Sequence, residues 1–253
     1  MAFFPHCVRA GVACSLGGTA SSLSHHMPLL EIHELKKSFR RPEGGTQAVL
    51  DIPSFVCGAG QQIALRGESG SGKTTFLNII AGILRPDSGT VTLAGGKMSD
   101  LNEAGRDLLR ARTLGYIFQT FNLLQGHTAL ENVLLGMAFG PGEDRAFAAD
   151  LLKRVGLGDR IHHLPRQLST GQQQRVAVAR ALASRPRLVL ADEPTGNLDH
   201  VRASESLALI RESCSANGVA LLLVSHDPGI LAQFDSVQDF NDINRAVVRE
   251  EIR

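Results

Sequence analysis

The stretch Gly67-Glu68-Ser69-Gly70-Ser71-Gly72-Lys73-Thr74 decides the fold of this chain. It has the pattern Gly-x4-Gly-Lys-Ser/Thr, with strand-like residues 62–66 before it and helical residues 74–81 after it. In such a unit the glycines let backbone N–H groups point at phosphate oxygens, and the helix N-terminus adds partial positive charge. The stretch therefore predicts a phosphate-binding loop in an α/β fold, and the plain alternative is a glycine-rich turn.

Within this loop we expect a division of roles around a bound nucleotide. Lys73 would reach the β- and γ-phosphates, Thr74 would hold Mg²⁺, and Thr75 would hydrogen-bond on the α-phosphate side. The predicted nucleotide contacts of the loop are Gly67, Glu68, Ser69, Gly70, Ser71, Gly72, Lys73, Thr74 and Thr75.

Two adjacent carboxylates follow an apolar strand predicted over residues 187–191. A buried strand places its C-terminal residues at the sheet edge where ligands bind. Asp192 there suits a water-mediated Mg²⁺ contact, and Glu193 suits orientation or deprotonation of an attacking water. On an ordinary loop such a pair would be solvated and without function, but here it follows a strand in a chain with a phosphate loop.

Two single polar residues end other predicted strands. Gln119 follows residues 114–118, and its amide could bridge metal, water and a moving segment. His226 follows an apolar strand over residues 221–225, at the same sheet edge as Asp192, so contact with the γ-phosphate is expected. Each residue taken alone is more often structural than catalytic.

A second anion-binding helix start is predicted at Leu168-Ser169-Thr170-Gly171-Gln172. Ser169 and Gln172 form a Ser-x-x-Gln capping box, and Gly171 permits close backbone approach to an anion. The plain interpretation is a well-capped helix. Because the phosphate loop already provides one cradle, this helix start suggests contact with the γ-phosphate bound by another subunit.

Composition limits the classes of partner. The chain has 253 residues and a formal charge of +1, with 26 basic and 25 acidic side chains, one Tyr and no Trp. A balanced charge with few stacking rings argues against nucleic acid as a partner. The four cysteines show no metal-ligand spacing, and no apolar run approaches the roughly 20 residues of a membrane helix.

The first 26 residues show no apolar periodicity, and Arg9 interrupts any signal-peptide core. We therefore expect 1–28 to be a spurious N-terminal extension, with translation starting at Met27, or otherwise a disordered tail. Residues 29–253 would form one nucleotide-binding domain, with a helical insertion at about 97–183.

These motifs together resemble the nucleotide-binding domain of an ABC (ATP-binding cassette) ATPase over about residues 29–231. The resemblance implies a P-loop NTPase α/β fold: a RecA-like mixed-sheet core, an antiparallel β subdomain and an inserted α-helical subdomain. It implies ATP and Mg²⁺ as cofactors, Phe39 stacked on adenine, and Asp199 in a loop that contacts the opposite subunit. By this resemblance Glu193, His226 and Gln119 are catalytic, Thr74, Gln119 and Asp192 serve the metal, and Ser169, Gly171 and Gln172 contact nucleotide.

Several stretches are similar to the branch that includes lipoprotein-release, macrolide-export and cell-division (FtsE-like) ATPases. They are residues 118–124, 172–177 and 192–199. Two departures stand out: Thr170 replaces the usual glycine of its motif, and Phe240-Asn241-Asp242-Ile243-Asn244 lacks the usual Asp-Gly hairpin. The second leaves the last strands without a clear prediction.

The function implied is an ATP-hydrolysing subunit that powers export or lipoprotein extraction through a separate integral membrane permease. A second ATPase subunit, as a homodimer, and a peripheral place on the cytoplasmic face of the inner membrane are also implied. The alternatives are FtsE-like control of periplasmic cell-wall enzymes without transport, and a soluble non-transport ABC ATPase. A simple nucleotide kinase would leave the Ser169 helix without a purpose.

Overall fold

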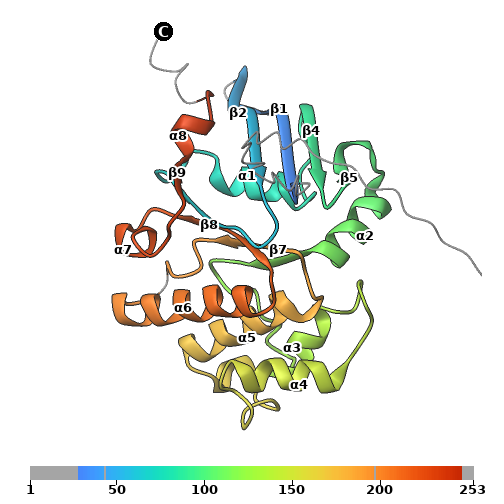
Figure 1. The fold of residues 1–253 in the computed structure, drawn as a ribbon, viewed down its shortest axis with the longest axis vertical. Coiled ribbons are helices and arrows are strands. Elements are labelled where there is room, and N and C mark those ends of the chain that lie inside the picture. Colours follow the sequence, from blue (N-terminus) through green and yellow to red (C-terminus); the bar gives the residue numbers. More distant parts are fainter. Residues whose placement is uncertain (1–27, 43, 197, 247–253) are drawn as a thin grey trace, which may run out of the picture.

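Two β-sheets organise the chain (Figure 1). The computed structural model describes residues 28–42, 44–196 and 198–246, so the prediction for the N-terminal extension, including Met27, lies outside the described residues. The first sheet is antiparallel with strand order β2-β1-β4-β5: β1 Leu30–Arg40, β2 Thr46–Cys57, β4 Ser88–Leu93 and β5 Gly96–Lys97.

The second sheet is parallel and carries the motifs. Its order is β6-β7-β8-β3-β9: β3 Gln62–Arg66, β6 Leu114–Ile117, β7 Leu188–Asp192, β8 Ala220–Ser225 and β9 Val237–Asp239. Parallel strands have their carboxyl ends on one edge, so the residues after β3, β7 and β8 come together. The parallel and antiparallel parts of the predicted fold thus reside in separate sheets.

Helices cover the parallel sheet on both faces (Figure 1). α1, α2 and the antiparallel sheet lie on one side, and α3 to α6 form a helical lobe on the other. The helices are α1 Lys73–Ile80, α2 Glu103–Thr113, α3 Ala129–Leu135, α4 Arg145–Arg154, α5 Thr170–Ala183, α6 His200–Ala216, α7 Pro228–Leu231 and α8 Phe240–Ile243, with short 3-10 helices Met98–Asp100 and Pro165–Gln167.

Alternating side chains along the buried strands contribute to two separate hydrophobic clusters, one on each face of the parallel sheet. On β7, Leu188 and Leu190 pack with α1 and the antiparallel sheet, while Val189 and Ala191 pack with the helical lobe. Successive side chains of a strand point to opposite faces, and both faces of this sheet are covered, so the strands read as continuous apolar runs. Packing on both faces therefore holds in place the edge of the parallel sheet at which its strands end.

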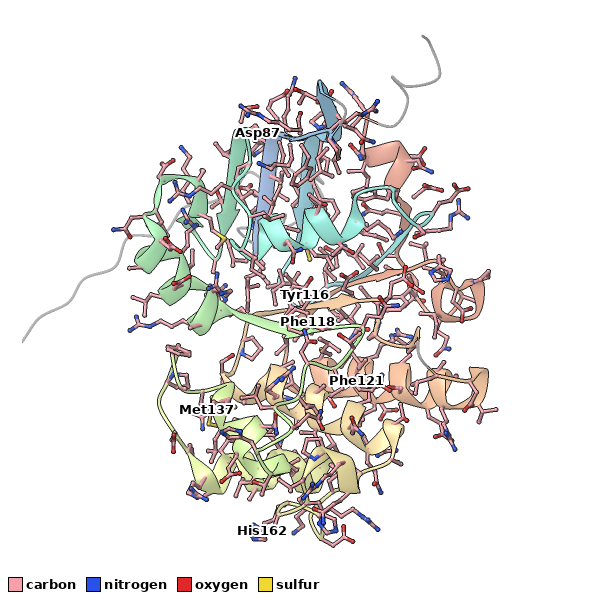
Figure 2. The ribbon with its side chains drawn as sticks, turned by 180° about the vertical axis from the view of Figure 1, so that it is seen from behind. Asp87, Tyr116, Phe118, Phe121, Met137 and His162 are labelled. Carbon is pink, nitrogen blue, oxygen red and sulfur yellow. The ribbon has the colours of Figure 1, made fainter. Side chains whose placement is uncertain are left out.

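The chain enters the helical lobe beyond β6, where the Tyr116 and Phe118 rings stack with centroids 4.2 Å apart (Figure 2). Within the range predicted for the helical insertion, β6 pairs in parallel with β7. The part of the lobe that follows consists of α3, α4 and α5, in which α3 and α4 both pack on α5. Met137 lies in the lobe core and Phe121 on the way into it (Figure 2).

Side-chain caps set the helix starts. The predicted capping box is present at Ser169–Gln172, and a second one is present at Thr128–Glu131. α4 starts at Arg145, because the Asp144 carboxylate accepts a hydrogen bond from the Phe147 N–H and caps the helix there.

Burial raises the pKa of Cys57 to about 11 and that of Cys214 to about 12, so both remain neutral thiols at neutral pH. Across the described ranges, none of the helices combines the length and apolar character needed to traverse a bilayer.

Candidate active site

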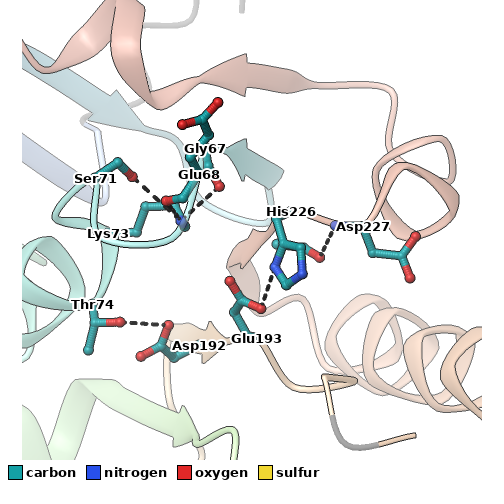
Figure 3. Close-up of polar contacts among 10 residues, drawn as sticks. Gly67, Glu68, Ser71, Lys73, Thr74, Asp192, Glu193, His226 and Asp227 are labelled. Atoms are coloured by element: carbon teal, nitrogen blue, oxygen red, sulfur yellow. Dashed lines mark hydrogen bonds and ion pairs between the residues drawn. The ribbon is translucent and has the colours of Figure 1, made fainter. Parts of the chain in front are cut away.

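The loop between β3 and α1 wraps around the Lys73 side chain (Figure 3). Lys73 is only 5% exposed, and its Nζ donates to the carbonyl oxygens of Gly67 and Glu68 at 2.8 and 2.5 Å. Burial lowers the pKa of Lys73, and the nearby Glu193 and Asp192 oppose this effect. The lysine is thus held inside its own loop by backbone carbonyl oxygens.

Gly72 shows why the loop needs glycine. Its φ of 97° lies in the left-handed region, and a Cβ built there would stand 3.0 Å from the Val49 carbonyl oxygen. Gly72 is also the N-cap of α1, so the loop ends on the exposed N–H groups of a helix. This is the local geometry of an anion-binding helix start.

The two carboxylates stand where β7 ends (Figure 3). The Thr74 hydroxyl donates to Asp192 Oδ1 at 3.2 Å, which joins the phosphate loop to this strand. Burial raises the pKa of Asp192, although the Thr74 hydrogen bond acts in the opposite direction. A hydroxyl and a carboxylate side by side are oxygen ligands that suit Mg²⁺, so this pair fits the predicted metal role.

Glu193 has a left-handed backbone with φ of 44°, which is uncommon for a residue that carries a side chain. Its N–H donates to the Val224 carbonyl oxygen at 3.1 Å, and its carboxylate meets His226. Nδ1 of His226 lies 2.7 Å from Oε2 of Glu193 (Figure 3). The side chain of Glu193 is 16% exposed, whereas that of His226 is 62% exposed.

These groups line a cavity of about 350 Å³. This volume is in the range of small-ligand sites. The predicted site residues in its lining come from the phosphate loop, the strand ends and the loop after β6: Ser69, Gly70, Gly72, Lys73, Thr74, Thr75, Gln119, Asp192, Glu193 and His226. Loop residues Gly67, Glu68 and Ser71 form the wall behind Lys73.

Other predicted residues stand apart from this cavity. Phe39 is the second-last residue of β1, is 41% exposed, and has Lys37 Nζ at 5.4 Å from its ring centroid. Asp199 caps α6 by accepting from the Arg202 N–H at 3.0 Å, and this hydrogen bond is the main cause of its lowered pKa. Adenine stacking by Phe39 and a subunit contact by Asp199 remain predictions.

The start of α5 does not line this cavity. Ser169 Oγ accepts from the Gln172 N–H at 3.3 Å, and Gln172 Oε1 accepts from the Ser169 N–H at 3.0 Å. Ser169 is exposed, and a Cβ added to Gly171 would meet nothing within 4 Å. The residues predicted to bind phosphate therefore fall into two groups, one at the cavity and one on an open helix start.

Comparison with known proteins identifies this arrangement. The model of the ABC transporter family matches residues 50–196, more than half of the chain. The chain belongs to the ABC transporter family. It is an ATP-binding subunit of that family and an ATPase, as the resemblance of its motifs implied.

Individual relatives of this ABC ATPase agree. The lipoprotein-releasing system ATP-binding protein LolD of Shewanella oneidensis is 45% identical over 211 residues, covering 82% of this chain and 91% of LolD. The macrolide export ATP-binding/permease protein MacB of Rhodopirellula baltica is 40% identical over 230 residues, covering 89% of this chain. The chain spans about a third of MacB, 33% of its length.

A solved structure confirms the fold class. The dimeric post-hydrolysis state of the ATP-binding cassette MJ0796, bound to ADP and Pi, superposes with a TM-score of 0.75 at 33% identity. The match covers 83% of this chain and 93% of that one.

Two connections in this ABC ATPase were not predicted from the sequence. Gln174, 1% exposed, donates from Nε2 to the Pro194 carbonyl oxygen at 2.8 Å, which ties α5 to the turn after Glu193. Arg180 donates to the carbonyl oxygens of Phe121 and Asn122, both at 2.6 Å, which ties α5 to the loop after Gln119. For both connections, the sequence shows only a polar residue at a position of the helix that is expected to be buried.

Proposed function

We propose that this chain is the ATP-hydrolysing subunit of a lipoprotein-release or macrolide-export type of transporter, acting on a separate integral membrane permease. The identity to LolD and MacB supports the substrate class, and the family supports coupling of ATP hydrolysis to transport. In this proposal the subunit sits peripherally on the cytoplasmic face of the inner membrane, where it meets both ATP and the permease.

The observation that carries the proposal is the separation of the two predicted phosphate-binding helix starts. α1 begins in the cavity, whereas α5 begins at exposed Ser169 outside it. A nucleotide seated against Lys73 would leave its γ-phosphate open on one side. The Ser169 helix start of a second copy would close that side, and two copies would enclose two ATP molecules.

Within each site the residues of this chain divide the chemistry. Lys73 and the loop N–H groups would hold the phosphates, and Phe39 would stack on adenine. Thr74, Asp192 and Gln119 would hold Mg²⁺, which when bound offsets the phosphate charge. Glu193 would accept a proton from the attacking water, and His226 would orient the carboxylate and contact the γ-phosphate.

Glu193→Gln tests this assignment because it keeps the shape of the side chain and removes the base. We expect turnover to fall by about 100-fold or more, while ATP binding persists. The variant with ATP should elute as a dimer by light scattering, and the wild type with ADP as a monomer. Unchanged turnover, or a monomer under every condition, would overturn the proposal.

The permease is tested separately. The tagged wild-type subunit should co-purify with a multi-span membrane protein from detergent-solubilised membranes, and Glu193→Gln should retain it more firmly in ATP. Recovery of the active ATPase with no membrane protein would leave the ATPase assignment intact and reject the transport assignment.

A further inference from the structure

The last described segment of the chain lies directly behind the phosphate loop. Residues 237–246 fall outside the 50–196 range that matches the ABC transporter family. β9 pairs in parallel with β3, the strand that leads into the loop, with Asp239 opposite Arg66. Arg66 Nη2 also lies 2.6 Å from Asp239 Oδ2, and α8 then runs toward β2 (Figure 1).

Phe240 packs against the base of the loop. It is fully buried, and its ring centroid lies 5.5 Å from that of Phe76 on α1. A Cβ added to Gly67 would stand 3.2 Å from the Cβ of Phe240, so the two backbones are in close approach. The segment therefore contacts the loop at its first residue through packing.

Asn244 makes the second contact through hydrogen bonds. Its side chain is 0% exposed, and Nδ2 donates to the carbonyl oxygens of Ser71 at 3.2 Å and Val49 at 2.9 Å. Oδ1 accepts from the N–H groups of Asp51 at 2.8 Å and Ala246 at 3.2 Å. Both amide hydrogens and the carbonyl oxygen are thus used, and a buried amide satisfied in this way is held in one orientation.

We propose that Asn244 is a positioning residue for the phosphate loop, which it fixes to β2 through Ser71. Ser71 comes just before Gly72 and Lys73, so the hydrogen bond to its carbonyl sets the direction of the N–H groups that follow. The segment that carries Asn244 is the rear support of the nucleotide site. This inference rests on the proposed nucleotide role of the loop.

The chain offers a matched control in Asn132. Its side chain is also 0% exposed, with Oδ1 accepting from the Leu124 N–H at 2.8 Å. Its Nδ2 donates to the carbonyl oxygens of Leu124, His127 and Thr128 at 3.0–3.1 Å. Asn132 belongs to α3 in the helical lobe and does not line the cavity. The same substitution at both positions thus removes similar bonds, but only one of them touches the phosphate loop.

The test compares Asn244→Asp with Asn132→Asp in the full chain. Both put a carboxylate oxygen against carbonyl oxygens, and both should lower the melting temperature. At about pH 8, we expect Asn244→Asp to weaken binding of Mg-ATP by about tenfold in titration calorimetry, and Asn132→Asp by less than about twofold. In ATPase assays, Asn244→Asp should affect substrate binding more than turnover, with KM raised about tenfold and kcat within about threefold of wild type.

A pH series separates positioning from general damage. A buried carboxylate beside carbonyl oxygens has a raised pKa, and its protonated form can donate to Ser71 again. The binding defect of Asn244→Asp should therefore shrink by about threefold or more between about pH 8 and pH 6, relative to wild type at each pH. Asn244→Ser, which is shorter and does not titrate, should show a defect that stays constant with pH.

The serine variant also serves if the aspartate variant does not fold, because it introduces no charge. Equal losses of ATP affinity at positions 244 and 132, or wild-type affinity in a folded Asn244 variant, would overturn the inference. A wild-type chain that fails to bind ATP would instead reject the proposed function, so the two failures are distinguishable.

Discussion

His226 and Glu193 are joined across neighbouring strands, with Nδ1 of the imidazole 2.7 Å from Oε2 of the carboxylate. Each residue directly follows its strand, β8 or β7, and the two strands pair in parallel. The contact therefore depends on the register of the central sheet. Ser225, 3% exposed, accepts from the Asp227 N–H at 3.1 Å and fixes the turn that holds the imidazole.

Removal of the His226 imidazole should slow ATP hydrolysis without weakening ATP binding. We expect His226→Ala to lower kcat by about 100-fold, because Glu193 loses the partner that orients it, while KM for ATP changes by less than about threefold. Steady-state phosphate release measures both values. His226→Gln keeps a donor near Glu193 and should retain more activity than alanine; equal activity of the two variants would argue against an orienting hydrogen bond.

Ser169 and Thr128 provide a comparison between two capping boxes. Each variant to alanine should cost about 1 kcal/mol of folding stability, because each removes a helix cap. Only Ser169→Ala should lower ATPase activity by about tenfold or more, because only that helix start is proposed to meet nucleotide. Thermal melts and ATPase assays are made side by side, and parallel losses of activity would show that Ser169 acts through stability alone.

Asp192 should destabilise the nucleotide-free protein at neutral pH. Its pKa in the folded state is raised by burial, so protonation favours folding. Its favourable contribution is complete below the unfolded value of about 3.9 and is lost as the pH rises through the folded value. Asp192→Asn should therefore melt a few degrees above wild type at pH 7, with Mg-ATP no longer adding stability.

The pH dependence of that comparison provides its check. The advantage of Asp192→Asn should shrink as the pH falls toward the folded pKa and vanish once the wild-type carboxyl is protonated. Scanning calorimetry from neutral to acid pH measures it. A variant less stable than wild type at pH 7 would mean that Thr74 and Lys73 stabilise the charge more than burial destabilises it.

Gln174→Leu tests the connection between α5 and the turn after Glu193. The change leaves the Pro194 carbonyl oxygen without its donor, so we expect kcat to fall by about tenfold as Glu193 loses its fixed position. Gln62→Leu is the control, because Gln62 also donates to a backbone carbonyl, that of Arg211, at 3.1 Å. Gln62 lies at the start of β3, away from the cavity. An equal loss of kcat in Gln62→Leu would reject a specific role of Gln174 in positioning Glu193.

The sequence predicted the central strands and their polar ends because the signal is local. An apolar run such as Leu188-Val189-Leu190-Ala191 needs both faces of a sheet to be covered, and the residue after it is placed by that fact alone. The strand predicted over 221–225 spans Ala220–Ser225, so His226 directly follows the strand as predicted. Grouping Lys73, Asp192, Glu193 and His226 in one cavity followed from parallel pairing.

The C-terminal segment could not be predicted in the same way. β9 has three residues, and its partner β3 lies far back in the chain, so its pairing leaves no periodic pattern. The roles of Asn244, Gln174 and Arg180 depend on which backbone groups the fold leaves without partners. Sequence reasoning identifies such residues only as polar side chains within apolar surroundings.

α5 has 14 residues, which makes it about 21 Å long. Its first turn presents Ser169 outward, its middle holds Pro194 through Gln174, and its last turns hold Phe121 and Asn122 through Arg180. A rigid helix that is attached at two places and carries Ser169 at its open end cannot move at one of them alone. The stiffness of this single helix would therefore have two effects. It would couple the binding of the two nucleotides, and it would set when a movement reaches the partner that contacts the Gln119 loop.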